Sequence, residues 1–155
     1  MVAGRFLKSI TAGAIVLGLG ITLAYASADD AIKGRQACMK SHGASMGIMV
    51  PMFKGEKPYD NAAIQAVLAK EEAACADWSK FWGADTMKGE TAETWAKPEI
   101  WSDAKGFETA GGNWYKAYTT IKATTDEAGF KAAFPALGSS CQGCHEKFRP
   151  RRNKP

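Results

Sequence analysis

The sequence predicts an all-α protein, an antiparallel up-down-up-down bundle of four helices. Apolar residues recur at the three- and four-residue spacing of amphipathic helices, and no segment alternates as a half-buried strand does. The length of 155 residues suits one domain, and a composition of 46% apolar and 23% charged residues is that of a chain that buries a core. Four periodic segments joined by two short turns and one longer loop match this architecture.

The first 28 residues have the order expected of a secretory signal peptide. Arg5 and Lys8 are followed by an uncharged apolar stretch over 10–23, and Ala26-Ser27-Ala28 fits the small-x-small rule for cleavage. An uncleaved membrane anchor is the alternative, but a spanning helix needs about 20 apolar residues. We therefore expect residues 29–155 to form the mature domain, which is exported, does not span a membrane and carries its cysteines in an oxidising compartment.

The first two helices are expected on either side of a turn at 55–58. A helical stripe runs over 30–54, and Asp60 or Asn61 can cap a second helix that extends to Trp82. The following residues, 83–97, hold two glycines and no sustained periodicity, so they are expected to form the longer loop.

The last two helices are expected over 98–121 and from Thr125 or Asp126 to Phe148. Pro98 suits a first helical turn, whereas Pro135 lies within the fourth helix and should kink it or split off its first turn. The net charge of +4 is mixed in sign along the middle of the chain, which argues against a nucleic-acid-binding face.

The chemistry of the chain is concentrated at Cys141-Gln142-Gly143-Cys144-His145, the C-x-x-C-H attachment signature of c-type haem. Two thiols at this spacing reach the two vinyl groups of one porphyrin, and His145 then faces the iron as an axial ligand. A thioredoxin-like redox pair would need a βαβ context, and a zinc site would need four ligands from recognisable pairs. A disulfide within the motif would leave His145 without a role.

The chain resembles the class II cytochromes c, the cytochrome c′ family. The resemblance rests on the haem motif at the C-terminal end, followed by Phe148-Arg149, and on Arg35-Gln36 in the first helix. Further matching segments are Gly47, Pro51, Lys54-Gly55, Pro58-Tyr59-Asp60 and Pro98-Glu99-Ile100-Trp101. The resemblance implies that Arg35 and Gln36 contact the haem, with Arg35 near a propionate, and that Arg149 lies beside His145 on the proximal side.

The resemblance also implies two branches that differ in the sixth position on the iron. In one branch the site is open and binds nitric oxide or carbon monoxide; in the other, a methionine fills it and the protein carries electrons. The residue four positions after the family arginine is Met39, on the same helix face as Arg35. We therefore expect Met39 to be the distal ligand, with His42 as a rival that more simply reads as a polar residue at the edge of the bundle. Met46 and its neighbouring methionines read as core or surface residues.

The resulting prediction is a periplasmic one-electron carrier and not an enzyme, with one covalent haem c and redox proteins as partners. An open-site, gas-binding cytochrome is the alternative. Glu71 and Glu72 read as parts of a helix face. Family members are often dimers through the first two helices, so a homodimer is expected here.

The remaining cysteines, Cys38 and Cys75, lie at nearly equal distances from the turn between the first two helices. In an antiparallel pair they therefore sit at nearly the same height. Whether they are two buried thiols or one disulfide depends on the rotation of the helices, which the sequence leaves open.

Overall fold

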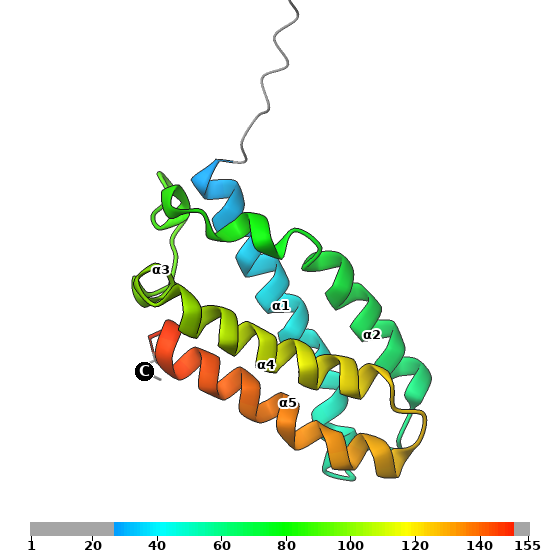
Figure 1. Cartoon of the computed structure of the whole chain (residues 1–155). Coiled ribbons are helices and arrows are strands. Elements are labelled where there is room, and N and C mark those ends of the chain that lie inside the picture. Colours follow the sequence, from blue (N-terminus) through cyan, green and yellow to red (C-terminus); the bar gives the residue numbers. More distant parts are fainter. Residues whose placement is uncertain (1–26, 151–155) are drawn as a thin grey trace, which may run out of the picture.

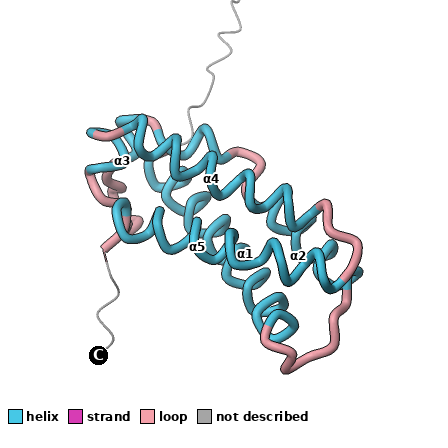
Figure 2. The backbone as a smooth tube through the Cα atoms, turned by 60° about the horizontal axis from the view of Figure 1, so that its bottom comes forward, coloured by secondary structure: helices cyan, strands magenta, loops and turns pink. Residues whose placement is uncertain are grey.

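The computed structural model describes residues 27–150 as a bundle of four long helices (Figure 1). The long helices are α1 (Ala28–Phe53), α2 (Asn61–Ala74), α4 (Ala104–Lys122) and α5 (Glu127–Phe148). The shorter elements are η1 (Trp78–Trp82), η2 (Ala84–Thr86) and α3 (Glu99–Ser102). The described residues form helices and loops without a strand, as Figure 2 shows. The predicted all-α four-helix architecture is confirmed.

The bundle is built from two antiparallel hairpins, α1 with α2 and α4 with α5, packed against each other (Figure 1). Their shared core lies toward the end of the molecule that holds the α1–α2 turn and the α4–α5 turn. Its fully buried members include Met49 on α1, Ile64 and Leu68 on α2, Ile121 on α4 and Phe130 on α5. This end therefore supplies most of the apolar burial, and the haem motif lies toward the other end of α5.

Aspartate side chains begin three of the four long helices. The carboxylates of Asp60, Asp103 and Asp126 accept hydrogen bonds from the backbone N–H groups of Ala63, Gly106 and Gly129, respectively. Each bond satisfies a backbone donor that the first turn leaves without a helical partner. The sequence-based starts at Asp60 and Asp126 agree with these caps.

The second helix ends earlier than the sequence predicted. It stops at Ala74 instead of continuing to Trp82, and the chain then turns into the short helix η1. The physical reason lies in the backbone carbonyls of η1. That of Phe81 accepts a hydrogen bond from Arg35, and that of Trp82 accepts one from the Trp101 indole. Tertiary contacts therefore replace the helical bonds that an extended α2 would make.

Two expectations about the later helices also need correction. The third helix is divided at Asp103, whose non-helical backbone and capping side chain end α3 and begin α4. Pro135, in contrast, does not split α5, which is one continuous helix from Glu127 to Phe148. The proline ring is on the exposed side of α5, where a missing backbone donor is easily tolerated.

Residues 1–26, which make up most of the expected signal peptide, lie outside the described part of the chain. Within residues 27–150, no helix combines the length and the hydropathy needed to cross a bilayer.

A disulfide joins α1 to α2 through Cys38 and Cys75, whose Cα atoms are 4.9 Å apart. The sequence had left this pairing open because it could not give the rotation of the helices. Cys38 is fully buried and Cys75 is half-buried, so the bond lies between the two helices near the end of α2.

Replacing both cysteines with serine, in Cys38→Ser/Cys75→Ser, should lower the free energy of unfolding by about 3–4 kcal/mol. The disulfide closes a loop with a sequence separation of 37 residues, and losing it restores chain entropy to the unfolded state. Denaturant unfolding followed by helix content measures the difference. Equal free energies for the wild type and the double variant would contradict a bonded pair, as would two labelled thiols in the denatured, unreduced wild type.

Candidate functional site

The haem motif occupies the last two turns of α5. Cys141 and Cys144 are half-buried free thiols, and His145 is half-buried beside them. Burial raises the pKa of both thiols, and the charge of Glu71 raises that of Cys141 further. Burial lowers the pKa of His145, as does the nearby charge of Arg149. The motif thus presents two protonated thiols and a neutral imidazole on one short stretch of helix.

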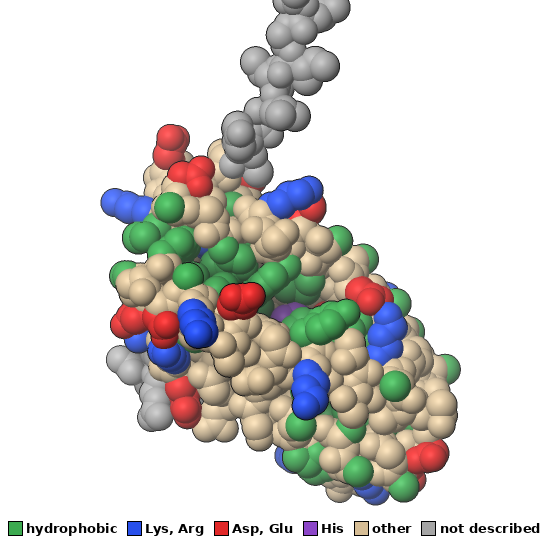
Figure 3. Space-filling view, viewed as in Figure 1, with side chains coloured by type: hydrophobic (Ala, Val, Ile, Leu, Met, Phe, Trp, Pro, Cys, Tyr) green, Lys and Arg blue, Asp and Glu red, His purple; other side chains and the backbone are tan. Residues whose placement is uncertain are grey.

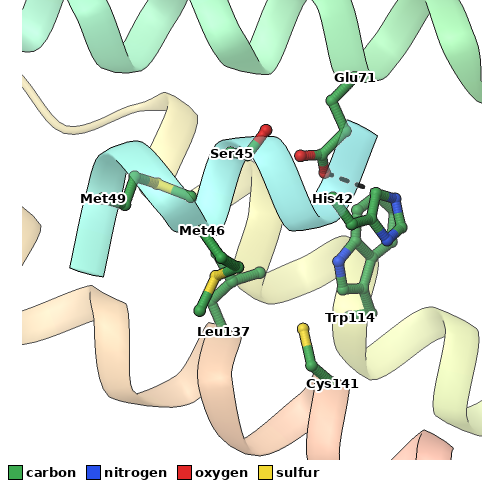
Figure 4. Close-up of a pocket in the computed structure, with 8 residues that line it drawn as sticks. All are labelled: His42, Ser45, Met46, Met49, Glu71, Trp114, Leu137 and Cys141. Atoms are coloured by element: carbon green, nitrogen blue, oxygen red, sulfur yellow. Dashed lines mark ion pairs between the residues drawn. The ribbon is translucent and has the colours of Figure 1, made fainter. Parts of the chain in front are cut away.

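Cys141 faces a pocket in the interior of the bundle (Figure 4). The pocket, together with the solvent-open space at its mouth, has a volume of about 180 Å³. It is lined by residues of all four long helices: His42, Ser45, Met46, Met49, Glu71, Trp114, Leu137 and Cys141. On the face shown in Figure 3, apolar side chains gather around a hollow in which histidine atoms are visible. The thiol therefore faces a mostly apolar space with a few polar groups, which is the usual character of a cofactor site.

His42 lies inside this pocket, so its placement at the bundle edge was wrong. Its ring stacks on Trp114 with centroids 4.7 Å apart, and its Nε2 atom lies 3.5 Å from Glu71 Oε1. The same nitrogen lies 3.6 Å from Cys38 Sγ and 3.4 Å from Cys75 Sγ. Burial, together with the charge that His145 can carry, lowers the pKa of His42 to about 4. The imidazole is therefore neutral at pH 7.

Glu71, which the sequence indicated only as part of a helix face, is almost completely buried, with 3% of its surface exposed. Burial raises the pKa of this carboxyl, and a hydrogen bond from Ser45 opposes the rise. Its neighbour Glu72 is exposed and pairs with Lys122 at 2.7 Å. Buried carboxylates need a partner, and the partner of Glu71 here is a neutral imidazole instead of a cation.

The register between α1 and α5 indicates which residues of α1 are level with His145. The two helices run antiparallel, and in Figure 4 Leu137 lies by Met46 while Cys141 lies on the side of His42. His145 is four residues beyond Cys141, so it is level with residues about one turn before His42. These are Cys38, which is bonded to α2, and Met39, which is half-buried. Met39 itself does not line the pocket, whereas Met46 does.

Arg35 is buried, as its position on the apolar stripe indicated, with 4% of its surface exposed. Its guanidinium donates to the backbone oxygens of Phe81 and Thr86, both at 3.1 Å, and to the hydroxyls of Thr86 and Thr94, both at 3.3 Å. It also lies 4.8 Å from the centre of the Trp82 ring. Among the described residues, these oxygens and indole faces take the place of an anion.

The other two predicted haem contacts lie near the same loop. Gln36 is exposed, and its amide donates to the Glu93 carbonyl at 2.7 Å. The Arg149 guanidinium lies 5.2 Å from the centre of the Trp95 ring, and its backbone N–H donates to the His145 carbonyl. The structure thus places Arg149 beside His145, and the Arg35 and Gln36 side chains on α1 donate hydrogen bonds to residues 81–94.

The residues present fit a covalent haem. The C-x-x-C-H donors are free, and Cys141 opens on an apolar pocket. In addition, the buried Trp82 Nε1 has no hydrogen-bond partner, and the positive guanidinium of Arg35 lies over the same ring. A buried N–H donor beside a buried cation suits a carboxylate such as a haem propionate.

Sequence reasoning missed Glu71, Trp114 and Met46 as pocket residues. The i, i+4 spacings Cys38-x-x-x-His42 and Glu71-x-x-x-Cys75 could have suggested that these polar side chains share a helix face. No local signal distinguishes the pocket tryptophan from the other aromatic residues of α4.

Comparison with known proteins identifies the class to which this fold and site belong. The profile of the family described as cytochrome c′ matches residues 30–149, and the chain belongs to this family. Cytochrome c-556 of Rhodopseudomonas palustris is 33% identical over 144 residues, covering 90% of this chain and 94% of the relative. Cytochrome c′ of Alcaligenes xylosoxydans xylosoxydans is 33% identical over 132 residues, covering 83% and 99%.

Solved structures show the same fold. The crystal structure of cytochrome c′ from Rubrivivax gelatinosus matches with a TM-score of 0.73 and 31% identity, covering 81% of this chain and 99% of that one. A nitric oxide complex of a cytochrome c′ variant from Alcaligenes xylosoxidans matches with a TM-score of 0.69, at 32% identity and 82% and 99% coverage. The protein is thus a non-enzymatic haem protein of the cytochrome c′ family, and its cofactor is the covalent haem c of this family.

The first prediction for this site concerns haem attachment. Acid–acetone should leave the haem on the protein, because thioether bonds from Cys141 and Cys144 are not broken by acid. Mass spectrometry should show one haem per chain. Cys141→Ser and Cys144→Ser should each retain a single thioether, and the double variant should lose covalent haem. Extraction of free haem from the wild type would contradict the assignment.

The second concerns the pH dependence of stability. The pKa of His42 falls from 6.5 to about 4 on folding, so its neutral form is favoured in the folded state. This contribution to stability is complete above pH 6.5 and is lost as the pH falls toward 4. Between pH 6.5 and pH 4, the free energy of unfolding should fall by about 3 kcal/mol more in the wild type than in His42→Gln. Denaturant titrations at several pH values measure this, and parallel pH curves would contradict it.

Proposed function

We propose that this protein is an exported one-electron carrier in which His145 and Met39 are the axial ligands of the haem iron. The observation that carries the proposal is the register of α1 against α5, by which Met39 is level with His145. Haem iron supplies reversible one-electron exchange between its ferric and ferrous states. A thioether opposite a histidine stabilises the ferrous state and raises the potential.

The contacts of His42 argue against His42 as the distal iron ligand and therefore favour Met39. The His42 ring is held by its stacking on Trp114 and by Glu71, and its Nε2 atom is turned toward the disulfide. Its use as a ligand would require these contacts to be broken. Among the described residues, no hydrogen bond holds the Met39 side chain, so its flexible thioether is free to turn toward the iron.

The remaining groups have positioning roles in this proposal. Arg35 and the unpartnered Trp82 N–H would hold a propionate, and Arg149 would keep the proximal side positively charged. We also propose a periplasmic location, with redox proteins of that compartment as partners. A homodimer through α1 and α2 is supported by the exposed Gly43, Ala44 and Gly47, since small residues on the outer face of α1 let a second helix approach closely.

A gas-binding cytochrome with an open distal site is the second candidate. It is favoured by similarity to a cytochrome c′ that has been crystallised as a nitric oxide complex. In this case the half-buried Met39 would pack beside the distal face without binding the iron. The two candidates differ in the coordination number of the iron, which optical spectra of the same protein distinguish.

Met39→Leu should convert a six-coordinate low-spin iron into a five-coordinate one at nearly constant side-chain volume. We expect the sulfur-to-iron charge-transfer band of the ferric protein to disappear and the reduction potential to fall by on the order of 0.1 V. The ferrous variant should also bind carbon monoxide at once, whereas the wild type should not.

Met46→Leu is the matched control, because Met46 lies two turns further along the same face of α1 and lines the pocket. It should leave the spectrum and the potential unchanged. Loss of the charge-transfer band in Met46→Leu alone would assign the ligand to Met46. Immediate carbon monoxide binding by the wild type would overturn the electron-carrier proposal in favour of the open site.

A further inference from the structure

Cys38, His42, Glu71 and Cys75 lie close together between α1 and α2, and His42 and Glu71 also line the pocket that Cys141 faces. Cys38 and His42 are four residues apart on α1, and Glu71 and Cys75 are four residues apart on α2. Each pair therefore occupies one face of its helix, and the two faces meet. The sulfur atoms and the His42 ring nitrogen lie within 4.8 Å of one another, close enough to share one metal ion.

The distances around His42 match those of a tetrahedral zinc site. With Zn–S bonds of about 2.3 Å and Zn–N and Zn–O bonds of about 2.1 Å, a ligand nitrogen lies about 3.6 Å from each sulfur and about 3.4 Å from the oxygen. In this structure, His42 Nε2 lies 3.6 Å and 3.4 Å from the two sulfur atoms and 3.5 Å from Glu71 Oε1. Three of the six separations between ligand atoms are thus already in place.

Glu71 provides an independent reason to expect a cation. It is a 97%-buried carboxyl, given its 3% exposure, and it is aimed at the cluster through its contact with His42. A buried carboxylate without a positive partner is unfavourable, and a metal ion would supply that charge. The ligand types, two sulfurs with one imidazole nitrogen and one carboxylate oxygen, are those that Zn²⁺ binds in fourfold coordination.

We propose that these four residues form a zinc site when the Cys38–Cys75 disulfide is reduced. While the two sulfurs are bonded to each other, neither can act as a thiolate ligand. A dithiol reductant breaks this bond: it supplies two electrons and two protons, becomes a disulfide itself, and leaves two protein thiols. Zn²⁺ then binds both sulfurs, the imidazole and the carboxylate, and the two thiol protons are released.

The site requires the sulfur atoms and the Glu71 carboxylate to move, because the ligand atoms that already lie within 4.8 Å of one another are those of Cys38, His42 and Cys75. The sulfur atoms must separate to about 3.8 Å to occupy two corners of a tetrahedron around zinc. Rotation of the cysteine side chains about their Cα–Cβ bonds provides most of this movement, since the Cα atoms are 4.9 Å apart. The metal would replace the covalent link between α1 and α2, so the hairpin stays joined in both redox states.

The test measures zinc bound to the complete haem protein before and after reduction. The protein is treated with a phosphine reductant, which opens disulfides and leaves thioethers intact, and is then dialysed against ZnCl₂. Zinc and haem iron are quantified in the same sample by mass spectrometry. We expect about one zinc per haem in the reduced protein and none in the oxidised protein. X-ray absorption at the zinc edge should show two sulfur ligands with the remainder nitrogen or oxygen.

The variants identify the ligands. His42→Gln and Glu71→Gln should each weaken zinc binding at least tenfold, whereas Glu72→Gln, which changes the adjacent exposed carboxylate, should leave it unchanged. Cys38→Ser/Cys75→Ser should bind no zinc in either state. Should a variant lose its haem spectrum or helix content, the comparison of oxidised with reduced wild type decides the question by itself.

Two results would overturn the proposal. One is a reduced wild type that binds no more zinc than the double serine variant. The other is tight zinc binding that survives both His42→Gln and Glu71→Gln, because the thiolates would then bind zinc without the other two residues.

Discussion

The bond between Cys38 and Cys75 is the constraint on which the geometry of α1 depends. Consecutive residues on a helix point about 100° apart, so fixing Cys38 toward α2 also fixes the direction of its neighbours. His42, four residues later, is brought to the same side and meets Glu71 and Trp114. Met39, one residue later, is turned away from α2 and becomes the free residue level with His145. A covalent bond outside the haem motif thereby constrains the direction of the α1 side chains near the pocket.

Arg35 imposes a second constraint, one turn before the disulfide. Its buried guanidinium must be satisfied, and its four hydrogen bonds go to Phe81 in η1, Thr86 in η2 and Thr94 in the loop that follows. Asp29 holds the same loop from the start of α1, where hydrogen bonds from Thr91 and Ala92 lower its pKa to about 2. The largely irregular segment is therefore attached to α1 by polar contacts. The adjoining helix η1 contributes Trp82, whose indole N–H has no hydrogen-bond partner among the described residues.

The parts of the structure that the sequence could predict are those determined by local pattern. Apolar periodicity predicted four helices, aspartates predicted two of their starts, and the C-x-x-C-H motif predicted the cofactor. The end of α2 could not be predicted in this way, because carbonyls of η1 are used by Arg35 and Trp101, which are distant in sequence. Glu71 illustrates the same difficulty: the sequence gives Glu71 and Glu72 only as parts of a helix face, and the packing of α2 against α1 shows that one is buried and the other exposed. The direction of Met39 likewise depends on the rotation of α1, which periodicity alone does not give.

The four cysteines have two different roles, and a cysteine that has one role cannot have the other. The topology of the chain keeps the two pairs apart. Cys141 and Cys144 must stay free to bond haem, whereas Cys38 and Cys75 bond each other. Pairing Cys38 with Cys141 would close a loop roughly threefold longer than the native one, at an extra entropic cost of about 1 kcal/mol. The α1–α2 hairpin also precedes α5 in the chain, so its two cysteines can meet before the haem motif is available. Within the folded protein, burial and the charge of Glu71 raise the pKa of Cys141, and a thiol that stays protonated is a poor nucleophile toward disulfides. The same buried carboxylate thus contacts His42 beside the disulfide and disfavours ionisation of the thiol that must react with haem.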